Sequence, residues 1–272
     1  RKPHAIVVGS FRSEVLLAAM DLIARYRLPY ITTIAMTPEF ERKLASDYNR
    51  YKYLFRMGIN SPYFVSALTH LLRYLDERYG TKRAYLIYQD VLWARAVASG
   101  VDSWAKENGW TVVGSDGYPT GSADFSASLA RARSGRAQVV VPIFDMPQSA
   151  VLVKQARSMQ VPAVIAGYIS PAAQETAWEA FDGAVEGLVQ LISEPGPMGV
   201  KILPRSLQFQ EAYGRRFGED ARRKLSGHGP GPAYDSVYVL SAAIQRAGSL
   251  DPDRVVAELE RTDMEGVIGR IR

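Results

Sequence analysis

Short apolar runs alternate with amphipathic stretches of helical length up to residue 192, and this alternation constrains the fold more than any other feature of the chain. The runs that we predict as strands are 5–8, 30–34, 84–88, 111–114, 138–142, 163–166 and 187–192. The predicted helices between them span 14–26, 63–78, 94–108, 125–133, 148–159 and 171–179. Strands that are apolar throughout and separated by helices are typical of parallel sheets covered on both faces. The sequence therefore predicts an α/β protein.

The part of the chain after residue 192 has a different pattern. Helical patterns at 206–217, 234–245 and 253–259 are joined by loops rich in Gly and Pro, among them 193–197 and 227–232. A single doubly wound domain would not need so many connectors after its sheet. A chain of 272 residues is long enough for two domains with cores of their own. We therefore expect two lobes, with the chain passing more than once between them.

The composition excludes several classes of protein. The chain has no cysteine, which removes disulfides, thiolate catalysis and cysteine-ligated metals. Its histidines, His4, His70 and His228, are far apart, so we expect no metal site. The formal charge of +5 comes from scattered basic residues rather than from one stripe, so we expect no nucleic-acid partner. No apolar run has the length of a membrane span, and an export signal would have to lie outside this chain.

Ligands of open α/β sheets bind outside the carboxyl ends of the strands, so the residues that follow the strands are the candidate site. These segments hold many aromatic and hydroxyl side chains, but the chain lacks a nucleophile elbow, a phosphate-binding loop and a dinucleotide fingerprint. Asp90 and Asp145 follow strands and could form an acid/base pair. Asp90 is better explained as a cap of the next helix. We therefore expect neither an enzyme nor a cofactor.

A binding function accounts better for the same segments. Ser13 starts a predicted helix, where a hydroxyl beside free backbone N–H groups makes a seat for a carboxylate. Arg12 could add a charged contact, although an exposed arginine at the helix start explains it better. Flat apolar walls would come from the aromatic residues Trp93, Phe144, Tyr168 and Tyr234. Each also has a structural interpretation, since Ser13 can be a plain cap, Trp93 and Phe144 can be core, and Tyr234 can close a helix.

Several segments in order resemble one known family. They are AIVVGSFRSEVLLAAMDLIARYRLPYIT (5–32), YKYLFRMGINSPYFVSAL (51–68), the stretch from RAYLIYQDV to QVVV (83–141), AYDSVYVLSAAIQRAG (233–248) and VIGRI (267–271). Together they resemble the type I periplasmic substrate-binding proteins of ABC transporters, in the branch for branched-chain amino acids and amides. The resemblance implies two doubly wound α/β lobes joined by a three-crossing hinge, a Venus flytrap, with the N-terminal part of lobe 1 absent from the chain. Lobe 1 would comprise 1–58 and 193–264, and lobe 2 would comprise 59–192 and 265–272.

The resemblance also implies a site. In this family the first lobe holds the ligand carboxylate through the serine matched by Ser13 and the loop matched by Ile34, Ala35 and Met36. The second lobe closes aromatic residues over the ligand, at positions matched by Trp93 and Phe144. Two departures concern the ligand's amino group, because family members that bind amino acids have Ser or Thr at Met36 and an acid at Tyr168. Either Asp145 takes over the ammonium, or the ligand has no amino group.

The function that follows is an extracytoplasmic, non-enzymatic solute-binding protein. It would capture a small carboxylate-bearing ligand between its lobes, either an amino acid or an amine-free aromatic or branched carboxylate, and deliver it to an ABC permease. It would act in the periplasm or on the outer face of the cytoplasmic membrane, touching the membrane only through the permease or a lipid anchor. A cytoplasmic ligand sensor of the same fold, such as an amide sensor or a repressor effector domain, is the alternative. A hydrolase using Asp90 and Asp145 is the weaker one.

Overall fold

The computed structural model describes residues 4, 9–192, 199–225 and 228–272, and it divides into two compact units. Unit 1 comprises the described residues within Arg1–Asn60, Glu194–Arg222 and His228–Arg272. Unit 2 comprises those within Ser61–Ser193 and Arg223–Gly227. The predicted strand at 5–8 lies outside the described residues. Across the described ranges, no helix is both long enough and apolar enough to cross a membrane.

Unit 2 is built on a five-stranded parallel sheet with the strand order β4-β3-β5-β6-β7. The strands are β3 (Arg83–Gln89), β4 (Thr111–Tyr118), β5 (Val139–Phe144), β6 (Val164–Ile169) and β7 (Val189–Gln190). The chain steps from β3 to β4 in one direction and then places β5 on the other side of β3. The point where the strand order reverses, between the carboxyl ends of β3 and β5, is where doubly wound sheets bind ligands.

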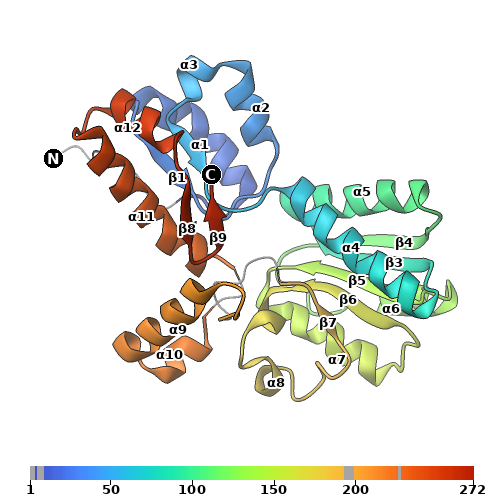
Figure 1. Cartoon of the computed structure of the whole chain (residues 1–272). Helices are drawn as coiled ribbons and strands as arrows, with labels where there is room; N and C mark the ends of the chain where they lie inside the picture. The colour runs from blue at the N-terminus through green and yellow to red at the C-terminus, as the bar shows by residue number, and fades with distance from the viewer. Residues whose placement is uncertain (1–3, 5–8, 193–198, 226–227) are drawn as a thin grey trace. The chain divides into compact units, whose positions relative to one another are not determined.

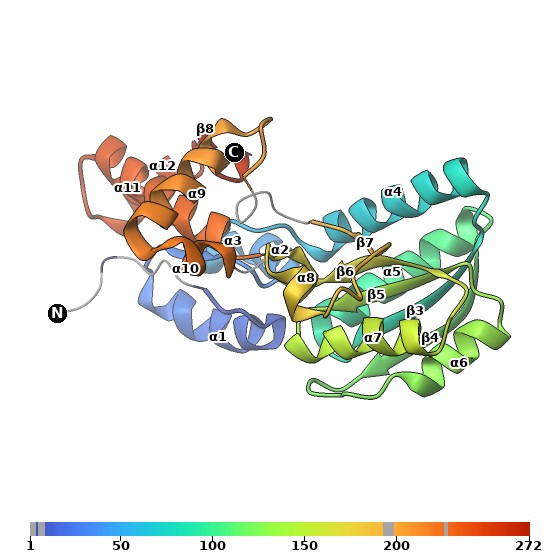
Figure 2. The ribbon, with the colours of Figure 1, turned by 90° about the horizontal axis from the view of Figure 1, so that it is seen from below.

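Helices cover both faces of this sheet, with α4 (Ser61–Tyr79) and α5 (Leu92–Glu107) on one face and α6 (Ser126–Ser134) and α7 (Ala150–Ser158) on the other (Figures 1 and 2). Helix α4 buries a stripe with the three-four spacing of one helix face, formed by Phe64, Leu68, Leu72 and Leu75. On the opposite face, α6 and α7 bury Leu129 and Leu152 against the sheet. The strands β3, β5 and β6 are therefore buried between the two helix layers, as their continuous apolar runs predict.

The connections after β5 and β6 differ from the prediction. The predicted helix 148–159 begins as a 3-10 turn, Pro147–Ser149, before α7. The predicted helix 171–179 is two short pieces, a 3-10 turn at Ser170–Ala173 and α8 at Ala177–Ala180, because Gln174 between them is extended. The predicted strand 187–192 is shortened to β7, which pairs with β6 through two residues only.

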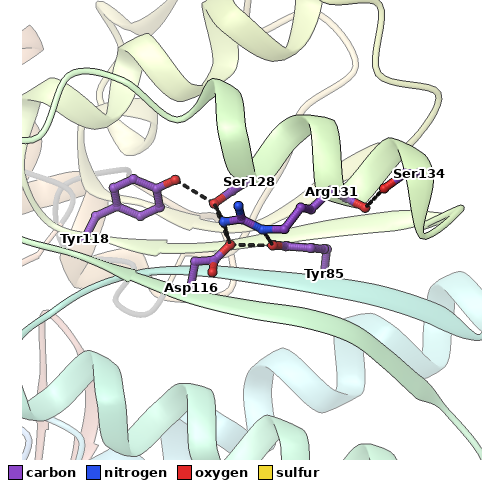
Figure 3. Close-up of polar contacts among 6 residues, drawn as sticks. All are labelled: Tyr85, Asp116, Tyr118, Ser128, Arg131 and Ser134. Atoms are coloured by element: carbon purple, nitrogen blue, oxygen red, sulfur yellow. Dashed lines mark hydrogen bonds and ion pairs between the residues drawn. The ribbon is translucent and has the colours of Figure 1, made fainter.

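A polar network joins α6 to the sheet at its β4 edge (Figure 3). The carboxylate of Asp116 on β4 accepts hydrogen bonds from Tyr85 on β3 and from Ser128 on α6, the latter at 2.5 Å. Arg131 of α6 donates to the same carboxylate at 2.7 Å and to the Tyr85 hydroxyl at 2.9 Å. Tyr118 extends the network through a 2.5 Å hydrogen bond with the Ser128 hydroxyl. Helix α6 is thus held by side chains from both neighbouring strands.

We expect Asp116→Asn to destabilise unit 2 by about 2 kcal/mol at neutral pH, since hydrogen bonds to charged groups contribute roughly that much. Burial alone would raise the pKa of the Asp116 carboxyl, but hydrogen bonds from Ser128, Tyr85 and Arg131 outweigh it and hold that pKa below 3.8. The network therefore stabilises the folded state above about pH 4 and loses this contribution as the pH falls through the folded-state pKa.

Urea denaturation at pH 7 and at pH 3 measures both effects, because the variant should differ less from the wild type at pH 3. Asp102→Asn is the matched control, since Asp102 pairs with Lys106 on the surface of α5. Equal losses for Asp102→Asn and Asp116→Asn would contradict the prediction.

Unit 1 contains a pair of parallel strands, β1 (Tyr30–Thr32) and β2 (Leu54–Arg56), and an antiparallel hairpin, β8 (Met264–Gly266) and β9 (Gly269–Ile271). Tyr30 and Ile31 of β1 point to opposite faces, as successive strand residues do. Tyr30 packs in a core cluster with residues of α1, α2 and α12, whereas Ile31 packs with α11 and α12. The helices of unit 1 are α1 (Ser13–Tyr26), α2 (Glu39–Ser46), α3 (Tyr48–Tyr51), α9 (Pro204–Phe217), α11 (Pro230–Ala247) and α12 (Pro252–Leu259), with α10 (Glu219–Arg223) at its border.

The structure corrects the expected assignment of residues 265–272 to the second lobe. They form most of the β8–β9 hairpin, and Asp235 of α11 holds the hairpin turn in unit 1. Asp235 is 2% exposed, and its carboxylate accepts hydrogen bonds from the backbone N–H groups of Val267, at 2.9 Å, and Ile268, at 3.0 Å. Gly266 leaves the room for this contact, because a Cβ there would lie 2.4 Å from an Asp235 oxygen. Burial raises the pKa of Asp235, and the two backbone hydrogen bonds oppose the shift.

Candidate functional site

The N-terminus of α1 carries a buried hydroxyl without a partner in the part of the chain that the structure describes. Ser13 is the first residue of this 14-residue helix and is 1% exposed. Its Oγ makes no hydrogen bond to any residue that the structure describes. The preceding residue is Arg12, whose side chain has no acceptor for the first N–H groups of the helix. A helix start without a capping acceptor, beside an unpaired buried hydroxyl, is suited to an anion such as a carboxylate.

Three loops of unit 1 meet near this helix start. The ring of Phe11 lies 5.5 Å from the ring of His228, in the loop before α11. Ile34, in the loop after β1, lies against Gly229, where a Cβ would come within 2.7 Å of the Ile34 Cδ1 atom. The backbone N–H of Ser10 donates to the Tyr30 hydroxyl at 2.9 Å. The segments 9–13, 33–37 and 228–229 are therefore neighbours, although they are far apart in the sequence.

The loop after β1 is buried. Ala35 is 2% exposed and packs in the core cluster of α1, and Met36 is 7% exposed. Thr37 is also buried, and its Oγ1 accepts a hydrogen bond from the N–H of Glu39 at the start of α2. The carbonyl groups of Ala35 and Thr37 accept hydrogen bonds from Arg56. Thr37 and Arg56 were not predicted as site residues from the sequence, because strand β2, which places Arg56, was not predicted either.

In unit 2, Asp145 lies at the point where the strand order reverses. Its backbone N–H donates to Oε1 of Gln89, the last residue of β3, at 3.1 Å. The Gln89 amide also donates to the Thr120 hydroxyl at 2.9 Å and is completely buried. The Asp145 carboxylate accepts a 3.1 Å hydrogen bond from the indole N–H of Trp93. Gln89 thus holds the backbone of Asp145, and Trp93 holds its side chain.

Two of the predicted aromatic residues lie beside this carboxylate. Trp93 and Tyr168 have ring centroids 6.2 Å apart, and Phe64 of α4 lies 5.9 Å from Trp93 and 5.0 Å from Tyr168. All three pairs have edge-to-face geometry, which aromatic rings favour. The rings are at most 5% exposed. The structure therefore brings Trp93, Asp145 and Tyr168 together and adds Phe64 and Gln89, which sequence analysis did not single out.

Two expectations, those for Phe144 and Asp90, need correction, and the role of Tyr234 stays a prediction. Phe144 is not an aromatic wall at the strand end, because its side chain is completely buried in the core under α6, with its ring 5.6 Å from that of Phe125. Tyr234 packs against Phe209 of α9 and donates to the Tyr238 hydroxyl, which raises the pKa of Tyr234 to about 12. Asp90 does not cap α5, whose N-cap is Val91, and instead pairs with Arg95 at 2.6 Å.

Comparisons with known proteins agree with this architecture. A model of the periplasmic binding protein family matches residues 3–272. The Leu/Ile/Val-binding protein homolog 8 of Brucella abortus is 23% identical over 265 residues, which cover 95% of this chain. The chain spans 63% of the length of that relative.

Two solved structures share the fold at low sequence identity. An ABC transporter substrate-binding protein from Desulfitobacterium hafniense in complex with Leu has a TM-score of 0.70 and 19% identity, over 99% of this chain and 72% of that one. A solute-binding protein from R. palustris in complex with benzoate has a TM-score of 0.76 and 14% identity, over 97% of this chain and 68% of that one.

Proposed function

Since the chain belongs to the periplasmic binding protein family, we propose that it is an extracytoplasmic solute-binding protein that captures a small carboxylate-bearing ligand and delivers it to an ABC permease. The observation that carries this proposal is the buried Ser13 Oγ at the start of α1, which has no hydrogen-bond partner among the described residues. A buried hydroxyl without a partner costs about 1–3 kcal/mol. A ligand carboxylate that accepts from Ser13 and from the first N–H groups of α1 would remove this cost.

The ligand that we propose is an amino acid. Ser13 and the loop formed by Ile34, Ala35 and Met36 would hold its carboxylate, and Asp145 would accept its ammonium. Asp145 is the acidic residue that follows β5 where the strand order reverses, and the Trp93 indole orients it. Trp93 and Tyr168 would contact the apolar part of the ligand. The relatives in complex with Leu and with benzoate bind a carboxylate with and without an amino group, so the amino group is the feature to test.

The test is a thermal-shift screen with two panels, L-amino acids beginning with L-leucine and amine-free carboxylates beginning with benzoate. At a hundredfold excess over its Kd, a ligand stabilises the protein by about 2.7 kcal/mol, which corresponds to a shift of several degrees in Tm. We expect shifts with amino acids. Shifts confined to benzoate and its analogues would contradict the role of Asp145, and no shift with either panel would contradict the proposed function.

Two single variants test separately the residues proposed to bind the carboxylate and the ammonium of the ligand. Ser13→Ala should raise the Tm of the ligand-free protein, because it removes an unpaired buried hydroxyl, and should weaken binding of both panels by about tenfold or more. Asp145→Asn should weaken amino acids by about a hundredfold and leave benzoate unchanged, because only the ammonium needs a buried counter-charge. Isothermal titration calorimetry measures each Kd. A Ser13→Ala protein that binds normally would show that the hydroxyl does not contact the ligand.

A further inference from the structure

Arg56, the last residue of β2, is a buried cation in unit 1. Its side chain is 8% exposed, although a charge removed from water needs partners to be tolerated. The guanidinium donates to the carbonyl of Ala35, to the carbonyl of Thr37 at 2.7 Å and to the carboxylate of Glu41 at 2.9 Å. Its central carbon lies 4.7 Å from the centre of the Phe40 ring. All three nitrogen atoms of the guanidinium thus donate to the segment 35–41.

The position of Arg56 in the sheet explains why it reaches this segment. Arg56 pairs with Thr32, the last residue of β1, so its side chain starts beside the point where β1 ends. The chain that leaves β1 has no regular secondary structure until α2 begins at Glu39. Ala35 and Thr37 are each 2% exposed, so their carbonyls depend on protein partners for hydrogen bonds. Arg56 supplies a donor to both, 21 and 19 residues away in the sequence.

We propose that Arg56 is the positioning residue that fixes the loop 34–37 in its ligand-binding shape. This inference rests on the proposed function, because it is the carboxylate-binding role of the loop that gives its shape a consequence. The planar fork of an arginine can serve two carbonyls and a carboxylate at fixed angles, whereas a lysine ammonium is a compact donor on a flexible stem. The charge is therefore less important than the geometry, and a lysine should not replace Arg56.

The decisive variant is Arg56→Lys, which keeps the charge and removes the fork. We expect the loop amides 34–37 to exchange with deuterium about tenfold faster than in the wild type, and the affinity for L-leucine to fall about tenfold, because charge-assisted hydrogen bonds to the loop are lost. The matched control is Arg270→Lys, which breaks a two-point pair with Asp263 in the same unit. The control should change neither quantity.

Deuterium exchange tests the role of Arg56 in the loop, and ligand affinity tests the proposed function, so the two proposals can be contradicted separately. Unchanged exchange in Arg56→Lys would overturn the inference whether or not any ligand binds. Faster exchange with unchanged Kd values for L-leucine and benzoate would also overturn it, because Arg56 would then be structural only. If the wild type binds neither probe, the proposed function fails, and the exchange data still decide whether Arg56 holds the loop. Should Arg56→Lys not fold, Glu41→Gln removes only the ion pair of Arg56, and a smaller change in the same direction in both quantities is expected.

Discussion

Phe144→Ala is expected to lower the free energy of unfolding of unit 2 by about 3–5 kcal/mol, the usual cost of truncating a buried phenylalanine. The Phe144 side chain is completely buried and meets Phe125 of the segment before α6 in edge-to-face geometry. Its removal leaves a cavity between β5 and the helices α6 and α7. Urea denaturation followed by tryptophan fluorescence reports this unit directly, because all 4 tryptophans of the chain lie within residues 93–178.

Phe144→Leu serves as the control, since it keeps most of the apolar volume and should cost much less than alanine. The two variants also decide whether Phe144 is a core residue or contacts the ligand. A core residue changes the unfolding free energy and leaves the Kd for L-leucine of the folded protein unchanged. An unchanged unfolding transition with weakened binding would restore the role in ligand binding that the sequence suggested for Phe144.

Asp235→Ala is expected to destabilise unit 1 by about 2–4 kcal/mol, because it leaves two backbone N–H groups of the β8–β9 turn without their acceptor. Val267 is buried, so water cannot readily replace the carboxylate at its N–H group. The loss should be seen as faster deuterium exchange in 264–271 and as a lower Tm. Unit 2 should keep its fluorescence transition.

Asp235→Asn is the informative partner of this variant. Its amide oxygen can still accept a hydrogen bond, but its NH2 group cannot accept the second one. We expect about half the loss of Asp235→Ala. If asparagine and alanine are equally destabilising, the carboxylate charge and not the pair of hydrogen bonds stabilises the turn. If neither variant lowers the Tm, the turn does not depend on Asp235.

The sequence predicted the family, which the comparisons confirm, and much of the fold. The strands β3, β5 and β6 were predicted because they are buried on both faces and are therefore continuously apolar, as in Val139–Phe144. Helix α2 was missed because Phe40 is its only buried residue and its exposed face is charged. Strand β2 was missed because three residues carry no periodicity. The β8–β9 hairpin was missed because Asp235, 32 residues before Val267, holds its turn.

In the candidate site, too, residues marked by a local sequence pattern could be singled out, and residues placed by long-range contacts could not. Ser13, Trp93 and Asp145 were singled out because each sits directly after a strand or at a helix start, where a local pattern carries the information, and their roles in binding stay predictions. Phe144 was misplaced because a strand's last residue can point along the sheet face rather than out of its end, and only the register tells which. Gln89 and Arg56 were missed because their partners lie 56 and 15–21 residues away, and a polar residue in an apolar run does not reveal which backbone group it will meet.

The Gln89 side chain has a consequence for exchanging parts between related proteins. One buried amide contacts the segments that follow β4 and β5 while itself ending β3, so three loops share a single support. A chimera that takes residues up to 100 from one parent and the rest from another would combine a glutamine with foreign partners at 120 and 145. Such junctions should yield weak binders even where both parents fold well. Transferring residues 89–146 as one segment keeps Gln89 with its partners Thr120 and Asp145. The ligand specificity of this edge of the sheet should then be transferred with the segment.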